Sequence, residues 1–472
     1  MSKEKAESWI ELLPETRRAL LRRIAVAQAE GRVPGLVAGV LREGELVWQG
    51  ARSCVPGHEP DADVQFRIGS ITKTFVAVLV LRLRDEGLLT LADPVGSHLP
   101  GLPEEVAGVS VAQLLCHSSG LSNEPSGPWW ERTEGALRPE LADLWRDGSA
   151  ERHPAGRVFH YSNLGYGLLG ALVERLRDGE HWFAVLRREV LEPLGMARTT
   201  LLAEAPHAGG WAVHPWADVL LPEPSGNDTG RMAPAGQLWS TLADLARWAR
   251  FLTDGDEKVL SRATLAEMRV HHSGTGAADW DSYGLGLQRA RTPAGVELVG
   301  HTGSMPGFLA ALWTARAEGL AAVVLANTTA GLPGGIGKLA ADLVSIVDER
   351  EPRIPEPWRP IPEAELDREL LELTGPWFWG PTGYTLRLRP GRVLELVPMS
   401  NTATREARLL PNPDGRTWRV EADSYWHGET LRVVRTEAGV HLDLGTFVLT
   451  REPYPAVGPT PGGVDPEGWR GL

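Results

Sequence analysis

A serine and a lysine stand one helical turn apart in the stretch Phe66-Arg67-Ile68-Gly69-Ser70-Ile71-Thr72-Lys73. At the start of a helix, this S-x-x-K spacing places the Ser70 hydroxyl and the Lys73 amine on the same face. A serine hydroxyl is a weak nucleophile that needs a base, and a desolvated lysine can be that base. An arginine cannot, because it does not deprotonate in proteins. The helix start also offers backbone N–H groups to a developing oxyanion. The spacing predicts a nucleophilic serine with a lysine base.

The same spacing has an ordinary structural explanation, in which Ser70 caps a helix and Lys73 is solvated at the surface. A second S-x-x-K occurs at Ser2–Lys5, in a charged stretch where we assign it no chemistry. Lysine is rare, however, with five lysines against 43 arginines, so this sequence uses arginine wherever a generic cation suffices. The scarcity favours the chemical interpretation of Lys73, although the motif alone leaves both open.

Two further motifs contain residue types that fit acyl-transfer chemistry. Tyr161 and Asn163 form a Y-x-N, in which a tyrosine hydroxyl near a lysine can relay protons and an asparagine can hold a substrate amide. His301-Thr302-Gly303-Ser304 follows the apolar run 296–299, and there a glycine lets substrate lie against a strand edge while the Ser304 N–H completes an oxyanion hole. The ordinary alternatives are a core tyrosine with a loop asparagine, and a plain turn at the end of a strand.

The ordered set Ser70-x-x-Lys73, Tyr161-x-Asn163 and His301-Thr302-Gly303 resembles the motifs of the superfamily of class C β-lactamases and low-molecular-weight penicillin-binding proteins. The segment 114–121, with the sequence LLCHSSGL, resembles the LLTHTSGL segment of that family. Segments 89–95 and 234–240 are similar to other pieces of it, and the resemblance covers about residues 15–350.

This resemblance implies that Ser70 is acylated, that Lys73 and Tyr161 shuttle its proton, and that Asn163 holds the substrate amide. His301 stands where many β-lactamases have the lysine of a K-T-G triplet. This departure disfavours a β-lactamase. A histidine at this position is similar to that of certain D-amino-acid-directed peptidases, esterases and acyltransferases of the superfamily.

The apolar patterns predict an α+β fold for residues 1–350, with a sheet assembled from both ends and helices inserted between them. The resemblance implies a β-lactamase/transpeptidase-like domain, with an antiparallel sheet and a helical subdomain. We expect helices at 14–30, 70–86 (ended by Gly87) and 336–347, and strands at 36–41, 45–49, 296–299, 308–314 and 321–326.

A change in the sequence pattern indicates a second domain. Residues 351–363 contain several prolines and are predicted to form a stiff linker. Residues 364–472 then show short alternating runs separated by turns, which predict a small all-β domain, either a lipocalin-like barrel or a sandwich. The expected strands are 384–388, 393–397, 417–420, 430–434 and 441–449.

The composition narrows the possible partners and locations. The net charge of −13 argues against a surface for nucleic acid or anionic membrane. Cys54 and Cys116 are the only cysteines, which suits a reducing compartment, and neither an export signal nor a membrane-spanning run is evident, so we expect a cytoplasmic protein. No metal or cofactor is expected. His271-His272 has no further ligand at metal-binding spacing, and the glycine-rich stretches 165–170 and 334–338 lack the context of nucleotide-binding loops.

With a cytoplasmic location and a β-rich second domain, the expected protein resembles the penicillin-binding-protein-type thioesterases. These enzymes release and cyclise non-ribosomal peptides through a D-residue at the acyl site. The resemblance predicts a peptide-like substrate that can arrive as a carrier-protein thioester. An intracellular D-aminopeptidase, amidase or carboxylesterase remains the alternative enzyme. A penicillin-recognising binding module is the non-enzymatic alternative, and the complete set of Ser70, Lys73 and Tyr161 disfavours it. The acyl donor, the acceptor and the oligomeric state stay open.

Overall fold

The computed structural model divides into two compact units, Met1–Ile354 and Pro355–Leu472. It describes residues 11–55, 60–132, 141–145, 150–223, 228–275, 282–329, 331–353, 357–400, 405–421, 425–436 and 439–454. The Ser2–Lys5 motif, the middle of the predicted linker and residues 455–472 of the predicted second domain lie outside the described residues.

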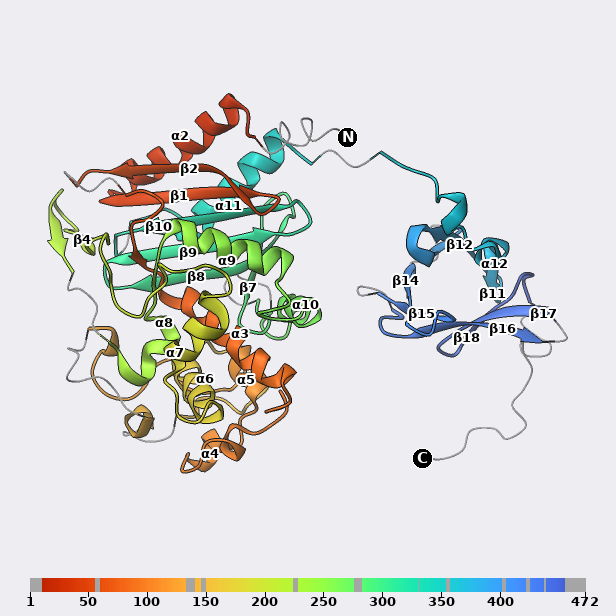
Figure 1. The fold of residues 1–472 in the computed structure, drawn as a ribbon, viewed down its shortest axis with the longest axis horizontal. Coiled ribbons are helices and arrows are strands. Elements are labelled where there is room, and N and C mark those ends of the chain that lie inside the picture. The colour runs from red at the N-terminus through yellow and green to blue at the C-terminus, as the bar shows by residue number, and fades with distance from the viewer. Residues whose placement is uncertain are drawn as a thin grey trace. The chain divides into compact units, whose positions relative to one another are not determined.

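The first unit is built on an antiparallel sheet with the strand order β2-β1-β10-β9-β8-β7, so both ends of the unit contribute neighbouring strands (Figure 1). The predicted strands are confirmed, and the structure adds β7, which the sequence patterns missed. The bounds are β1 Gly35–Arg42, β2 Glu45–Ser53, β7 Gln288–Arg291, β8 Glu297–Met305, β9 Phe308–Ala315 and β10 Leu320–Ala326.

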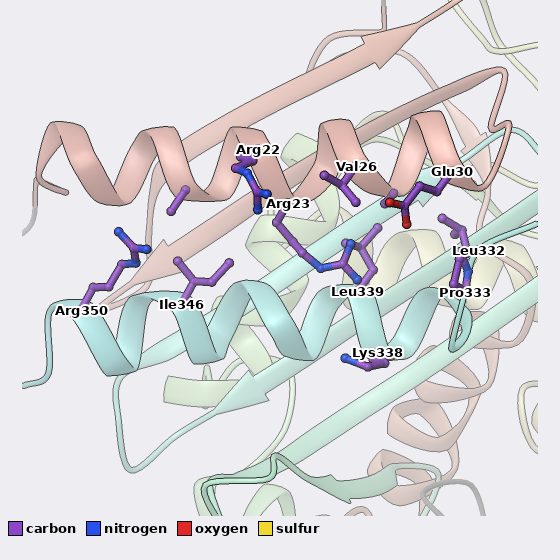
Figure 2. A pocket seen from close by; sticks show the side chains of 12 residues that line it. Arg22, Arg23, Val26, Glu30, Leu332, Pro333, Lys338, Leu339, Ile346 and Arg350 are labelled. Carbon is purple, nitrogen blue, oxygen red and sulfur yellow. The ribbon is translucent and has the colours of Figure 1, made fainter.

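Side chains alternate between the two faces of this sheet, and a different hydrophobic cluster covers each face. On β8, Leu298 belongs to the outer cluster with α2 (Pro14–Glu30) and α11 (Gly335–Arg350), whereas Val299 belongs to the inner cluster with α3 (Thr72–Asp85). The helices α2 and α11 run side by side in opposite directions on the outer face (Figure 2). The predicted helices at 14–30 and 336–347 are therefore confirmed.

The inner face is covered by α3, α9 and the inserted helical region. After one 3₁₀ turn at Gly69–Ile71, α3 buries every residue from Thr72 to Leu81, and Gly87 follows it with a φ of 76°. The other helices of this region are α4 Glu104–Ala107, α5 Val111–Leu115, α6 Asn163–Leu176, α7 Trp182–Leu186, α8 Ala233–Gly236, α9 Leu242–Asp254 and α10 Arg262–Arg269. Two short strand pairs complete it, β3 (Phe66–Arg67) with β6 (Trp239–Ser240) and β4 (Trp211–Val213) with β5 (Leu220–Pro222).

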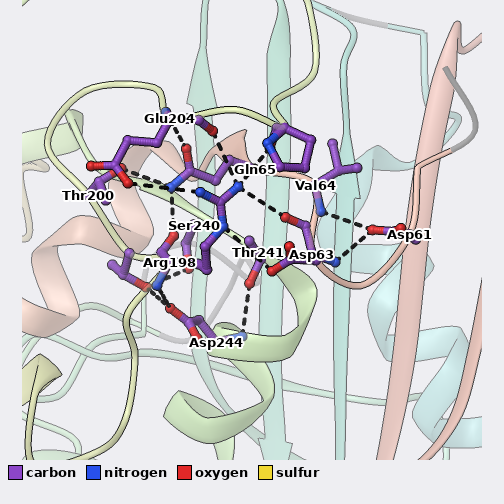
Figure 3. A network of polar contacts seen from close by, with 12 residues as sticks. Asp61, Asp63, Val64, Gln65, Arg198, Thr200, Glu204, Ser240, Thr241 and Asp244 are labelled. Atoms are coloured by element: carbon purple, nitrogen blue, oxygen red, sulfur yellow. Dashed lines mark hydrogen bonds and ion pairs between the residues drawn. The ribbon is translucent and has the colours of Figure 1, made fainter.

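A buried polar network fixes the segment that leads to Ser70 (Figure 3). The fully buried amide of Gln65 donates to the Arg198 carbonyl at 2.7 Å and to the Thr200 hydroxyl at 2.9 Å, and it accepts from the Glu204 N–H at 2.6 Å. Because a buried amide is costly to leave unpaired, these bonds hold β3 in place. The chain therefore enters the Ser70 turn from a fixed position.

The second unit is a nearly closed antiparallel barrel in which β11 to β18 follow one another in sequence order. Phe378 and Thr450 exchange backbone hydrogen bonds of 2.8 and 2.9 Å, which join the first strand to the end of the last. Of the two all-β alternatives, the barrel is confirmed. The interior is filled by buried side chains, among them Trp377, Leu396, Trp418 and Leu442. A short helix, α12 (Arg368–Leu373), precedes the strands, which are β11 Gly375–Trp379, β12 Thr382–Arg389, β13 Val393–Pro398, β14 Ala407–Pro411, β15 Thr417–Val420, β16 Thr430–Thr436, β17 Gly439–Leu444 and β18 Phe447–Leu449.

Within the described part of the chain, none of the helices has both the length and the apolar character needed to cross a membrane.

Candidate active site

The structure brings Ser70, Lys73, Tyr161 and Asn163 together at the start of α3. The Lys73 amine lies 2.9 Å from the Ser70 hydroxyl, 2.7 Å from the Asn163 side-chain oxygen and 2.6 Å from the Ala235 carbonyl oxygen. A neutral amine has two N–H groups and one lone pair. Because the Asn163 and Ala235 oxygens can only accept, they take the two N–H groups and turn the lone pair toward the Ser70 hydroxyl. In this arrangement a neutral Lys73 can accept the Ser70 proton.

Burial gives Lys73 and Tyr161 opposite acid–base properties. Lys73 is fully buried, and this desolvation lowers the pKa of its amine to about 7, against the opposing effect of the Glu124 and Glu131 carboxylates. Burial raises the pKa of the Tyr161 hydroxyl, which is hydrogen-bonded to Ser70. Near neutral pH, a substantial share of Lys73 is neutral while Tyr161 stays a phenol. Lys73 can therefore accept a proton, and Tyr161 can donate or relay one.

The loop that presents Tyr161 and Asn163 is anchored by the segment 117–124. The fully buried ring of His117 accepts the Ser162 N–H at 3.1 Å and lies 4.2 Å from the Tyr161 ring, centroid to centroid. Ser162 caps α6 and donates its hydroxyl to the Ser122 carbonyl at 2.7 Å. Asn163 thus begins a helix whose start is fixed from outside, and the LLCHSSGL segment supplies the support.

The structure corrects the expected position of the His301-Thr302-Gly303 triplet. The sequence suggested a strand over 296–299 with the triplet after it, but β8 continues through the triplet to Met305. The ordinary alternative, a plain turn at the end of a strand, is therefore wrong. A Cβ on Gly303 would stand 2.0 Å from the Ile68 carbonyl oxygen and 3.0 Å from the Ser70 nitrogen, so this glycine permits a close backbone approach rather than ending the strand.

The same close approach brings two backbone N–H groups together. A Cβ on Gly69 would stand 2.5 Å from the Ser304 nitrogen, so the Ser70 turn and β8 touch through their backbones. The Thr302 N–H points to the Gln288 side-chain oxygen at 3.2 Å, on the edge of β8 away from β9. Since N–H directions repeat every second residue in a strand, the Ser304 N–H points to that same edge. With the Ser70 N–H it can form an oxyanion hole.

His301 is buried beside Tyr161 and is neutral. Burial, followed by the effect of nearby Lys73, lowers the pKa of the His301 ring to about 3. Its Nδ1 is bonded to the Thr302 carbonyl, which can only accept, so Nδ1 carries the proton and Nε2 accepts the Tyr283 hydroxyl. The ring therefore places no positive charge where a K-T-G lysine places one.

Two glutamates of this site were not predicted from the sequence. Glu124 accepts from the Asn163 amide at 2.6 Å and from the Trp130 indole at 2.7 Å. Glu131 lines the same cavity as Ser70, and burial raises the pKa of its carboxyl. Both lie in a loop region without periodic pattern, so no sequence signal identified them. Tyr283 was missed for the same reason, whereas the Ala235 carbonyl lies in segment 234–240, which the resemblance had included.

The cavity around Ser70 has a volume of about 1260 Å³, and seven of the eight predicted site residues line it. They are Ser70, Tyr161, Asn163, His301, Thr302, Gly303 and Ser304, while Lys73 lies beneath, bonded to Ser70. Among the described residues, no cluster of three His, Cys, Asp or Glu side chains is arranged to hold a metal ion.

Comparison with known families identifies the class. The sequence model of the β-lactamase family matches residues 20–344, and the chain belongs to that family. It thus has a β-lactamase-fold serine-hydrolase domain, related to penicillin-binding proteins. A second model, a domain of unknown function (DUF7586), matches residues 366–451.

Among characterised relatives, penicillin-binding protein 4 of Amycolatopsis lactamdurans is 29% identical over 334 residues, which span 65% of this chain and 84% of that protein. Protein flp of Staphylococcus aureus is 25% identical over 312 residues, spanning 63% of this chain and 60% of flp.

Solved structures show the same fold at low identity. The octameric penicillin-binding protein homologue of Pyrococcus abyssi has a TM-score of 0.62 at 22% identity, covering 92% of this chain and 99% of that one. D-amino acid amidase of Ochrobactrum anthropi, complexed with L-phenylalanine amide, has a TM-score of 0.60 at 24% identity, covering 71% and 96%. SurE with D-Leu has a TM-score of 0.56 at 25% identity, covering 93% and 100%.

Proposed function

We propose that this chain forms an acyl-enzyme on Ser70 from peptide-like amides, esters or thioesters with a D-residue at the acyl position. The observation that carries the proposal is the buried Lys73 amine, whose two fixed acceptors turn its lone pair toward the Ser70 hydroxyl. A lysine with a pKa of about 7 at this place is a base near physiological pH.

In the first half-reaction, the Ser70 oxygen attacks the substrate carbonyl and its proton passes to Lys73. The N–H groups of Ser70 and Ser304 stabilise the negative oxygen of the tetrahedral intermediate. The bond to the leaving nitrogen, oxygen or sulfur then breaks, and that atom takes a proton through the Tyr161 hydroxyl. Water or an amine next attacks the ester, releasing an acid or a new amide and restoring Ser70.

The proposed reaction is the release and head-to-tail cyclisation of a non-ribosomal peptide thioester. SurE, whose structure matches 93% of this chain and was solved with D-Leu, supports a D-residue at the acyl position. The neutral state of His301 fits a substrate without a carboxylate at this wall. Delivery on a carrier protein and a cytoplasmic location belong to the same proposal, with neither nucleic acid nor membrane as a partner.

The test is mass spectrometry of the full chain incubated with short peptide thioesters ending in a D- or an L-residue. We expect acylation of Ser70 by the D-ended thioester and a cyclic product, because a well-oriented internal amine has an effective concentration of about 10⁵ M or more. Linear acid from every thioester would disprove the cyclisation and leave a hydrolase. No acyl-enzyme with any thioester, ester or amide would disprove the whole proposal.

Glu131 supports a second candidate, a D-aminopeptidase or amidase. Its carboxylate lies in the Ser70 cavity and pairs with the Trp129 indole at 2.9 Å, and burial raises its pKa. A substrate ammonium at this place would stabilise the ionised carboxylate. D-amino acid amidase of Ochrobactrum anthropi, a structural relative, was solved with D-phenylalanine.

Glu131→Gln is therefore expected to lower kcat/KM for D-aminoacyl esters with a free α-ammonium by about 10- to 100-fold, the worth of one charge-assisted hydrogen bond. The matched N-acetyl esters, which have no ammonium, should lose little. The measurement is steady-state hydrolysis of both ester series. Equal losses in the two series would show that Glu131 supports the fold of the loop rather than binding an ammonium.

A further inference from the structure

The cavity that contains Ser70 continues past β8 onto the outer face of the sheet. There it is lined by Ala290 of β7, Leu298 of β8, Leu309 and Trp313 of β9, and Ile336 and Ala341 of α11. We call these six residues the outer hollow. They come from the side of the sheet that α2 and α11 cover, not from the side of the helical region, so the hollow forms a second arm of the cavity.

The outer hollow exposes apolar surface that the protein itself leaves half covered. Ala290, Leu309 and Ala341 pack against the outer hydrophobic cluster but remain only partly buried. The start of α11 is held close beside them, because the Gly337 carbonyl accepts the Trp313 indole N–H at 3.0 Å. A binding site for an apolar ligand group requires apolar walls of this kind, and here they line the same cavity as Ser70.

The position of the hollow identifies which part of a substrate reaches it. Tyr161, which protonates the leaving atom, lies 6.4 Å from His301, centroid to centroid. The next residue, Thr302, bonds Gln288 at 3.2 Å through both its N–H and its hydroxyl, and Gln288 leads along β7 to Ala290. Asn163 and Glu131 lie in the helical region, on the other arm. A leaving group that is protonated by Tyr161 can therefore extend toward the hollow, while the acyl group extends toward Asn163.

The charged groups near the hollow are paired with one another, neutral or exposed, so the apolar walls form its main recognition surface. Lys338 bonds both oxygens of Asp342 at 2.8 and 2.9 Å. Arg23 reaches from α2 toward α11, as Figure 2 shows, and bonds the same carboxylate at 2.8 Å. His301, between the nucleophile and the hollow, is neutral. Among the described residues that line the cavity, the remaining cation is Arg291, whose side chain is exposed.

We propose that the outer hollow binds an apolar side chain on the leaving group, so that substrates with a large apolar amine, alcohol or thiol portion are preferred. The inference rests on the proposed acyl-enzyme function and names the substrate class of the same site. During acylation the carbonyl carbon bonds to the Ser70 oxygen, its bond to the leaving atom breaks, and that atom takes the serine proton. An apolar amine that attacks the acyl-enzyme occupies the same hollow, by the reverse of these steps.

The test compares two D-alanyl esters whose leaving alcohols react alike, the ethyl ester and the 3-phenylpropyl ester. Burial of the phenyl group in the hollow should raise kcat/KM for the second ester by about 10- to 100-fold. Ala341→Glu places a charge in the hollow and Ala341→Leu fills it, and each should bring the ratio of the two rates close to one. Ser345→Glu, one turn further along α11 and outside the cavity lining, should keep the wild-type ratio.

Three results would overturn the proposal, and they differ from one another. A wild-type ratio near one, with Ser70 acylated by both esters, rejects the hollow but not the acyl-enzyme. A preference that survives both Ala341 variants, shown by circular dichroism to be folded, places the phenyl group elsewhere. The absence of Ser70-dependent turnover of either ester rejects the proposed function and this inference together.

Discussion

Replacing Ser70 with alanine is expected to abolish covalent labelling by a fluorescent fluorophosphonate or β-lactam probe. The Ser70 oxygen is bonded to the Lys73 amine at 2.9 Å and also to the Tyr161 hydroxyl, so the proposed proton-transfer partners both meet this oxygen. The measurement is in-gel fluorescence of the purified full chain, followed by mass spectrometry of the labelled peptide.

Ser345→Ala is the matched control for this loss, because Ser345 lies on α11 outside the cavity lining. It should be labelled like the wild type. Full labelling of Ser70→Ala would assign the nucleophile to another residue, and the acyl-enzyme proposal would fail.

Replacing Lys73 with arginine is expected to lower the acylation rate by about 10²- to 10⁴-fold, as for lost acid–base catalysis. The change keeps a cation but removes the base. The wild-type rate is expected to increase with pH. The pKa of Lys73 is about 7, so the fraction of neutral amine increases as the pH rises. The rate should therefore rise through an inflection near pH 7 and then level off. The arginine variant should lack that inflection.

The controls separate the loss of the base from a disturbed core, since Lys73 is fully buried. Lys258→Arg, an exposed position, should retain the rate and the profile. In Lys73→Ala, added propylamine should restore part of the rate as the cavity takes up a free amine. A near-normal rate for Lys73→Arg would reduce Lys73 to an electrostatic anchor.

The motif residues of the candidate site were easier to predict from the sequence than the other residues that surround Ser70. Lys73 stood out because lysine is scarce in this chain and because a base must lie one turn from the nucleophile. Tyr161 and His301 were identified by ordered motifs. Glu131 and Tyr283 were not, because their proximity to Ser70 arises only when loops from distant parts of the sequence fold onto the same cavity.

The strands were predicted where alternation or a continuous apolar run marked them, and were missed or shortened elsewhere. Strand β7 is short and reads Gln-Arg-Ala-Arg, so it has no apolar period, and it exists because β8 pairs with it. In the barrel, β11 and β14 were missed, and the single run expected at 441–449 is two strands, β17 and β18, with a turn at Gly445 (φ 61°) between them. The run expected at 296–299 was too short, because β8 continues to Met305 through Gly303, a glycine that permits a close backbone approach.

The close backbone approaches of Gly69 to Ser304 and of Gly303 to Ile68 bear on how this chain can vary in evolution. The Ser70 and Ser304 N–H groups, which can form an oxyanion hole, are backbone groups brought together at two glycines, Gly69 and Gly303, where a Cβ would stand 2.5 Å or 2.0 Å from a backbone atom. The outer hollow is instead lined by side chains, of which Ala290, Leu309 and Ala341 are only partly buried. In the proposed function, selection can therefore exchange the side chains that contact the leaving group without touching the backbone positions around Ser70. A population of such chains could then sample new acyl donors by single substitutions in the hollow, while the geometry at Ser70 stays the same.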